Sequence, residues 1–155
     1  MRHIEQHHSL YAPQQLFEIV ADVERYPDFL PWIIAARVTR RENLTIRTNL
    51  TMGLKFFNKQ FTTIALLDRP HRIEVNSHDP MFDCFDQIWT FEPVTTGGTR
   101  IEYRVHLQFR SHVLQTLVGA SFAERGKIMV KAFIRRAERL YGTAQPARLG
   151  EQRSG

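Results

Sequence analysis

Three carboxylates lie close together in the sequence. Asp79, Asp83 and Asp86 flank the apolar segment at residues 80–82. Carboxylates beside apolar side chains can have raised pKa values and can then act as general acids and bases. A polar loop leading into a strand near Phe85 explains the same residues more simply, and the sequence supplies no nucleophile with a matching base. We therefore expect no catalytic residues and a protein that is not an enzyme.

The histidines and the cysteine do not form a metal-binding pattern. His7 and His8 are adjacent, so on a strand they would point to opposite faces, and no HExxH spacing occurs. Cys84 is the only cysteine, which excludes an internal disulfide and a thiolate metal cluster. The phosphate-binding glycine loop and the dinucleotide fingerprint are also absent. We expect no metal ion and no required cofactor.

Large apolar side chains are more informative than the polar ones. Many of them fall on one face of alternating, strand-like segments, and others recur at helical spacing near the C-terminus. They could form a solid core or line a cavity for a hydrophobic ligand. Gly126 interrupts the helical segment at a cost of about 1 kcal/mol relative to alanine, which indicates a close backbone approach or room for a ligand. The predicted cavity-lining residues are Trp32, Phe57, Phe61, Trp89, Phe91, Tyr103, Phe109, Phe122, Met129 and Phe133.

Basic residues crowd one side of the same C-terminal segment. A solvated helix face explains them, because cations are favoured near a helix C-terminus. Alternatively, they form a patch that binds the phosphates of lipid headgroups or of ribosomal RNA. The net charge of +5 is in keeping with anionic partners. The residues predicted to contact a membrane or ribosomal RNA are Phe29, Leu30, Lys127, Lys131 and Arg135.

The segment at residues 111–141 must position many of these side chains. Apolar residues recur in it every three or four positions, no proline interrupts it, and Gly142 follows where a helix often ends. This pattern predicts one long helix with a single apolar stripe. Helical propensity alone gives marginal stability, so the stripe requires a partner surface. We expect that surface to be a sheet.

The rest of the sequence supplies the sheet. Residues 3–10 are predicted to form a strand and residues 13–24 an amphipathic helix, whereas the two prolines in residues 25–32 predict a stiff, aromatic-rich loop. From residue 35 to residue 109 the alternation has period two and predicts about six strands joined by short turns. The sequence therefore predicts an α+β protein, in which a curved antiparallel sheet of about seven strands surrounds the C-terminal helix. Residues 1–142 would form one domain, followed by a disordered tail at residues 143–155.

Four segments carry a resemblance to a known family. They are VADVERYPDFLPW at residues 20–32, QIWTFEP at 87–93, RIEYRVHLQFRS at 100–111 and MVKAFIRRAERLYG at 129–142. The chain resembles the coenzyme Q-binding START-domain family of the polyketide cyclase/dehydrase superfamily, which also includes the bacterial ribosome association toxin. The resemblance implies a helix-grip fold of the START/Bet v 1-like type. Residues 79–86 and 121–127 depart from the usual family pattern.

The resemblance implies two non-enzymatic functions. The first is binding of ubiquinone between sheet and helix, as a carrier or chaperone that supports respiration and docks on an anionic membrane. The alternative is association with the large ribosomal subunit as a toxin-like inhibitor of subunit joining, and a cyclase-type enzyme is a third possibility. No apolar run reaches the ~18–20 residues of a membrane span, and the N-terminus has no signal-peptide core. We expect a cytoplasmic protein that is peripheral to the inner membrane, and the sequence leaves the oligomeric state open.

Overall fold

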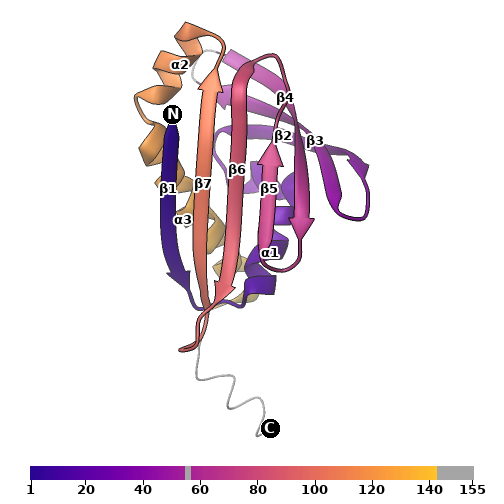
Figure 1. The fold of residues 1–155 in the computed structure, drawn as a ribbon, viewed down its shortest axis with the longest axis vertical. Helices are drawn as coiled ribbons and strands as arrows, with labels where there is room; N and C mark the ends of the chain where they lie inside the picture. The colour runs from indigo at the N-terminus through magenta and orange to yellow at the C-terminus, as the bar shows by residue number, and fades with distance from the viewer. Residues whose placement is uncertain (55–56, 143–155) are drawn as a thin grey trace, which may run out of the picture.

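The computed structural model describes residues 1–54 and 57–142, and the predicted disordered tail at residues 143–155 lies outside this part of the chain. The described residues form a curved sheet with helices on one of its faces (Figure 1). The strands are β1 (Arg2–Ser9), β2 (Ile33–Arg41), β3 (Thr45–Leu54), β4 (Phe57–Asp68), β5 (Arg72–Asn76), β6 (Phe82–Pro93) and β7 (Thr99–Phe109). The helices are α1 (Pro13–Ala21), the 3₁₀ helix η1 (Val23–Asp28), α2 (His112–Gly119) and α3 (Phe122–Tyr141).

The seven strands form one antiparallel sheet in the order β1-β7-β6-β5-β4-β3-β2. Strand β7 shows how the period-two alternation of apolar and polar residues corresponds to a strand with one buried face. Its apolar residues from Ile101 to Phe109 are buried toward the helices, while Arg100 and Arg104 on the opposite face are exposed. The predicted α+β architecture and the seven-stranded antiparallel sheet are confirmed.

The helices pack on the concave face of the sheet. Helix α1 begins at Pro13, where the missing amide hydrogen of proline costs no helical hydrogen bond, and it packs against β5, β6 and α3. Phe17 of α1 lies edge-on to Phe91 of β6, with ring centroids 6.0 Å apart. Helix α3 packs against α1 and β1, and its Phe133 lies 4.9 Å from the Trp89 ring of β6. These aromatic contacts hold the helices over the sheet.

The C-terminal segment differs from the prediction, because residues 111–141 form two helices instead of one. Helix α2 ends at Gly119 and α3 begins at Phe122. The hydroxyl of Ser111 caps α2 by accepting a hydrogen bond from the Leu114 amide at 3.3 Å. Helix α2 packs on β7, whereas α3 packs on β1 and α1. The chain therefore changes partner surface between the two helices, and the apolar spacing does not record this change of direction.

A smaller difference lies in the predicted loop, and close packing marks the end of the third strand. Residues 23–28, within and beside the predicted stiff loop, form η1, and Pro27 lies inside that 3₁₀ helix. Strand β3 continues through Gly53 to Leu54. A Cβ atom at Gly53 would lie 2.9 Å from the side chain of Ile34, so the glycine permits close packing of β3 against β2.

Candidate ligand-binding cavity

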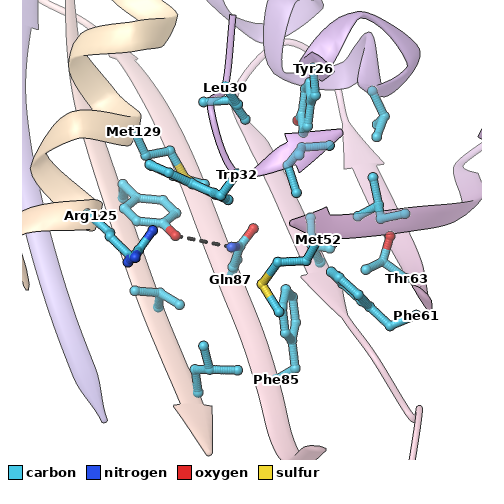
Figure 2. A pocket seen from close by; sticks show the side chains of 18 of the residues that line it. Tyr26, Leu30, Trp32, Met52, Phe61, Thr63, Phe85, Gln87, Arg125 and Met129 are labelled. Carbon is cyan, nitrogen blue, oxygen red and sulfur yellow. Dashed lines mark hydrogen bonds between the residues drawn. The ribbon is translucent and has the colours of Figure 1, made fainter. Parts of the chain in front are cut away.

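A largely apolar cavity lies between the concave face of the sheet, η1 and the first turns of α3. Its volume is about 130 Å³. Figure 2 shows side chains from these different elements pointing into it, among them Leu30, Phe61 and Phe85. Strand alternation supplies the sheet side of the wall, because every second residue of β3, β4, β6 and β7 points inward.

Most of the predicted lining residues meet at this cavity. Its wall includes Trp32, Phe61, Tyr103, Phe109, Phe122 and Met129. The side chain of Phe57 lies outside the described part of the structure. Three others lie elsewhere, packed in the aromatic core beside the cavity: Trp89, Phe91 and Phe133. The sequence pattern places them on the inward face correctly, but it does not distinguish solid core from cavity wall.

A polar pair on the sheet breaks the apolar lining. The Gln87 amide of β6 donates a hydrogen bond to the Tyr103 hydroxyl of β7 at 3.1 Å (Figure 2). Burial raises the pKa of Tyr103 above its ordinary value, so the group remains a neutral hydroxyl at physiological pH. Gln87 was not among the predicted site residues. The sequence does mark Gln87, because it is a polar residue on the inward, otherwise apolar face of the alternating segment from Phe85 to Phe91.

Arg125 is the second polar feature of the wall, and it comes from α3. Its Nε donates to the hydroxyl of Ser121 at 3.0 Å, and its Cζ lies 5.7 Å from the centroid of the Trp32 ring. Arg125 is one of the basic residues that crowd one side of the C-terminal segment in the sequence, where a solvated face is expected. The structure instead places it on the cavity wall, because α3 begins at Phe122 and turns this part of its first turns toward Trp32.

Gly126 has a clear packing role. A Cβ atom at this position would lie 2.3 Å from Cδ2 of His3, so the missing side chain lets α3 approach β1 closely. The His3 ring is itself held by a 2.9 Å contact between its Nε2 and Oε1 of Glu5. Of the two explanations that the sequence offered for Gly126, close approach is the one that the structure displays. The glycine also borders the cavity.

The predicted membrane or ribosomal RNA contacts gather at a second, outer groove. It has a volume of about 590 Å³ and lies between residues 27–31 and α3. Phe29, Leu30, Lys131 and Arg135 line it, whereas Lys127 does not. Leu30 is only 1% exposed and forms part of the core, so it is not a surface contact. The cations Lys127, Lys131 and Arg135 are exposed.

The acidic triplet lies away from the cavity wall. The Asp79 carboxylate accepts a hydrogen bond from the Met81 amide at 3.0 Å and shapes the turn before β6. Asp83 is exposed and forms a 3.4 Å ion pair with Arg110, and Asp86 is exposed as well. The polar-loop interpretation of these residues therefore agrees with their positions.

A comparison with known families places this fold and cavity in context. The family model described as "Polyketide cyclase / dehydrase and lipid transport" matches residues 10–134. The chain belongs to this family. The match spans strands β2 to β7, α1, η1, α2 and most of α3, so it covers the elements that form the site.

Two curated proteins are similar to this chain over most of its length. The ribosome association toxin RatA of Pseudomonas aeruginosa is 30% identical over 132 residues, covering 85% of this chain and 92% of the toxin. The mitochondrial coenzyme Q-binding protein COQ10 homolog B of Xenopus laevis is 26% identical over 136 residues, covering 85% of this chain and 56% of that protein.

A solved structure of another protein has the same fold. A START superfamily protein from Mycobacterium smegmatis superposes with a TM-score of 0.73 at 17% identity, covering 90% of this chain and 98% of the other. The predicted START-like, helix-grip fold is therefore confirmed. The chain combines this START-like fold with an apolar cavity suited to a lipid or another hydrophobic ligand. No described helix combines the length and the apolar character required to cross a membrane.

Proposed function

We propose that this protein associates with the ribosome, in the manner that the name of RatA describes. The observation that carries the proposal is the 30% identity to RatA across 92% of the toxin's length. A ribosome presents a dense array of phosphates, and a protein that binds it requires exposed cations without competing carboxylate partners. Two surfaces of the structure present several such cations.

The first surface is the outer side of α3. Lys127, Lys131 and Arg135 are exposed, and none of the three forms a salt bridge within residues 1–54 and 57–142. They recur every four residues, so they lie along one side of the helix. Such a row of cations can follow a phosphate backbone, and each contact would release bound counterions.

The second surface is the β2–β3 pair at the edge of the sheet. Arg37, Arg40 and Arg47 are exposed there. Arg40 and Arg47 are directly opposite in the antiparallel register, and like charges in that arrangement destabilise a sheet. A 2.6 Å ion pair between Arg40 and Glu42 reduces the repulsion between Arg40 and Arg47 in part. The remaining repulsion would be relieved by a bound polyanion.

Cosedimentation with purified ribosomes tests the proposal. We expect the wild-type protein to pellet with the large subunit at 50 mM salt and to be released steeply as salt rises. Replacing Lys127 and Lys131 with glutamate should reduce the slope of log affinity against log salt by about 1.5, because two phosphate contacts are lost. The control replaces Arg72 and Arg100, which are exposed and ion-paired on the sheet, with glutamate. The control has the same charge change and should still bind.

A parallel variant with glutamate at Arg37 and Arg47 separates the two surfaces. The variant that loses more affinity identifies the contact surface. Absence of wild-type cosedimentation even at low salt would rule out ribosome association.

The cavity supports a second candidate function, the binding of a hydrophobic ligand such as ubiquinone. Its volume of about 130 Å³ is close to the ~150 Å³ of an engineered apolar cavity that holds benzene. The cavity therefore fits one unsubstituted ring without rearrangement, and the ring substituents and polyprenyl tail of a quinone would have to extend beyond it. The similarity to COQ10 homolog B supports a quinone as the ring.

Membrane contact would be necessary for such a quinone carrier. A prenyl tail is already in an apolar environment in the bilayer, so transfer to the protein gains little free energy. The protein would have to load its ligand at the membrane surface. The outer groove offers half-buried Phe29 beside exposed Lys131 and Arg135, a combination suited to an anionic interface.

Mass spectrometry of lipid extracts from the purified protein tests this second function. Protein made in a quinone-producing host should contain ubiquinone in an amount approaching one per chain. A ligand-free preparation that also takes up no quinone on mixing would exclude it.

A further inference from the structure

We propose that Arg125 makes the cavity selective for amphiphiles whose polar head is an anionic oxygen group, such as a carboxylate, over neutral amphiphiles of the same size. The proposal rests on the second candidate function in its general form, the binding of a hydrophobic ligand; ubiquinone is neutral and would not be the preferred ligand of such a cavity. It adds the chemical class of the head group and the residue that selects it.

Two contacts fix the orientation of the Arg125 guanidinium. Its Nε donates to Ser121, one turn earlier, and the group lies over the Trp32 ring. Both contacts leave the terminal nitrogens Nη1 and Nη2 without a hydrogen-bond partner among the described residues. These two nitrogens form the edge that binds a carboxylate through two parallel hydrogen bonds. The guanidinium is therefore held in position before a ligand arrives.

The charge of Arg125 is not balanced by the cavity wall. No carboxylate forms a salt bridge with it in the described part of the chain, and the other polar lining groups are neutral. Gln87 and Tyr103 bond to each other, and burial raises the pKa of Tyr103, so that group supplies no negative charge. Around a cation on a largely apolar wall, the effective dielectric constant is lower than in water, which strengthens its attraction for an anion.

Arg136, on the same helix, is an arginine whose positive charge has a carboxylate counterion. Its guanidinium lies 5.4 Å from the Phe29 ring centroid, much as Arg125 lies over Trp32. It has in addition the Asp28 carboxylate at 4.0 Å. Arg136 is not part of the cavity wall. It therefore offers a matched control with the same side chain, the same helix and the same type of ring contact, but with its counterion already present.

The size of the cavity determines the probe. A volume of about 130 Å³ accommodates one ring or a short alkyl chain. Octanoate and 1-octanol have equally long chains and differ in the charge of the head, so the difference between their affinities isolates the contribution of that head. Binding can be followed through Trp32, whose fluorescence should respond to a charge placed beside its ring, and independently by calorimetry.

We expect the wild-type protein at pH 8 to bind octanoate at least tenfold more tightly than 1-octanol. Arg125→Gln should bring the two affinities within about twofold of each other by weakening octanoate alone, whereas Arg136→Gln should keep the wild-type preference. Arg125→Lys retains the charge without the two-pronged geometry, so it should keep part of the preference. If Arg125→Gln folds poorly, the Arg125→Lys variant still measures the contribution of the guanidinium to the preference.

Three results would overturn the proposal. Equal wild-type affinities for the two probes would remove the selectivity while leaving ligand binding in place. An unchanged preference in a folded Arg125→Gln variant would assign the selectivity to another residue. If neither probe binds, and ubiquinone does not bind either, the second candidate function fails together with this proposal.

Discussion

At the scale of single residues, Gly126 shows how one missing side chain determines a helix position. The nearest atoms that a Cβ would meet belong to the His3 ring, which is tied to Glu5. Gly126→Ala should therefore lower the free energy of unfolding by about 1–2 kcal/mol, since the clash outweighs a gain of about 1 kcal/mol in helix propensity. Chemical denaturation measures the change.

The same site offers an internal control. In a His3→Ala background the obstruction is absent, so Gly126→Ala should become neutral or stabilising. If the alanine costs as much in that background as in the wild type, the close approach to His3 is not the reason for the glycine.

Tyr103 gives a pH dependence at the residue scale. Its pKa is raised above the ordinary value of 10.0 because the hydroxyl is buried. Above pH 10 the unfolded chain releases this proton while the folded protein retains it. The folded state therefore keeps its full stability below pH 10 and loses about 1.4 kcal/mol per pH unit above it from this group. Denaturation curves between pH 9 and pH 11 should be less steeply pH-dependent in Tyr103→Phe, and an equal slope in both proteins would contradict the assignment.

At the scale of elements, the register of α3 decides which face packs on the sheet. Phe133 is 4% exposed and lies against the rings of Tyr26, Phe29 and Trp89. Phe133→Asp would leave a carboxylate among these rings and should destabilise the fold by several kcal/mol. Lys131→Glu, two residues earlier on the exposed side, should change stability by no more than about 0.5 kcal/mol. Thermal unfolding of both variants checks the register, which would be wrong if Lys131→Glu were the more damaging change.

At the scale of the whole molecule, the cavity and the cationic surfaces can be separated by mutation. Ala65 of β4 is 5% exposed and lines the cavity. Ala65→Leu should fill part of the empty space, leave the melting temperature unchanged or raise it, and block ligand uptake. Ribosome cosedimentation should remain intact, since Ala65 lies on neither cationic surface. Loss of both activities in a folded variant would indicate that the cavity and the surface act together.

The fold was predictable because its signals are local and repeated. The period-two alternation in β7 and the proline at the start of α1 each report their own element, and a sheet with one apolar face must be covered. The break between α2 and α3 was not predictable in this way. The residues at the break carry no proline, and the helices separate because they cover different strands.

The cavity residues were likewise predictable only in part. By itself the sequence determined that Phe61, Tyr103, Phe109 and Met129 face inward, because burial follows from periodicity. Only the tertiary structure decided that Trp89, Phe91 and Phe133 fill space while their neighbours border a cavity, since that difference depends on how closely the helices approach the sheet. It likewise decided that Arg125 borders the cavity and Lys131 does not, because the start of α3 sets where its first turns point. Periodicity records which face of an element is apolar, and the space left between two such faces depends on contacts between residues far apart in the chain.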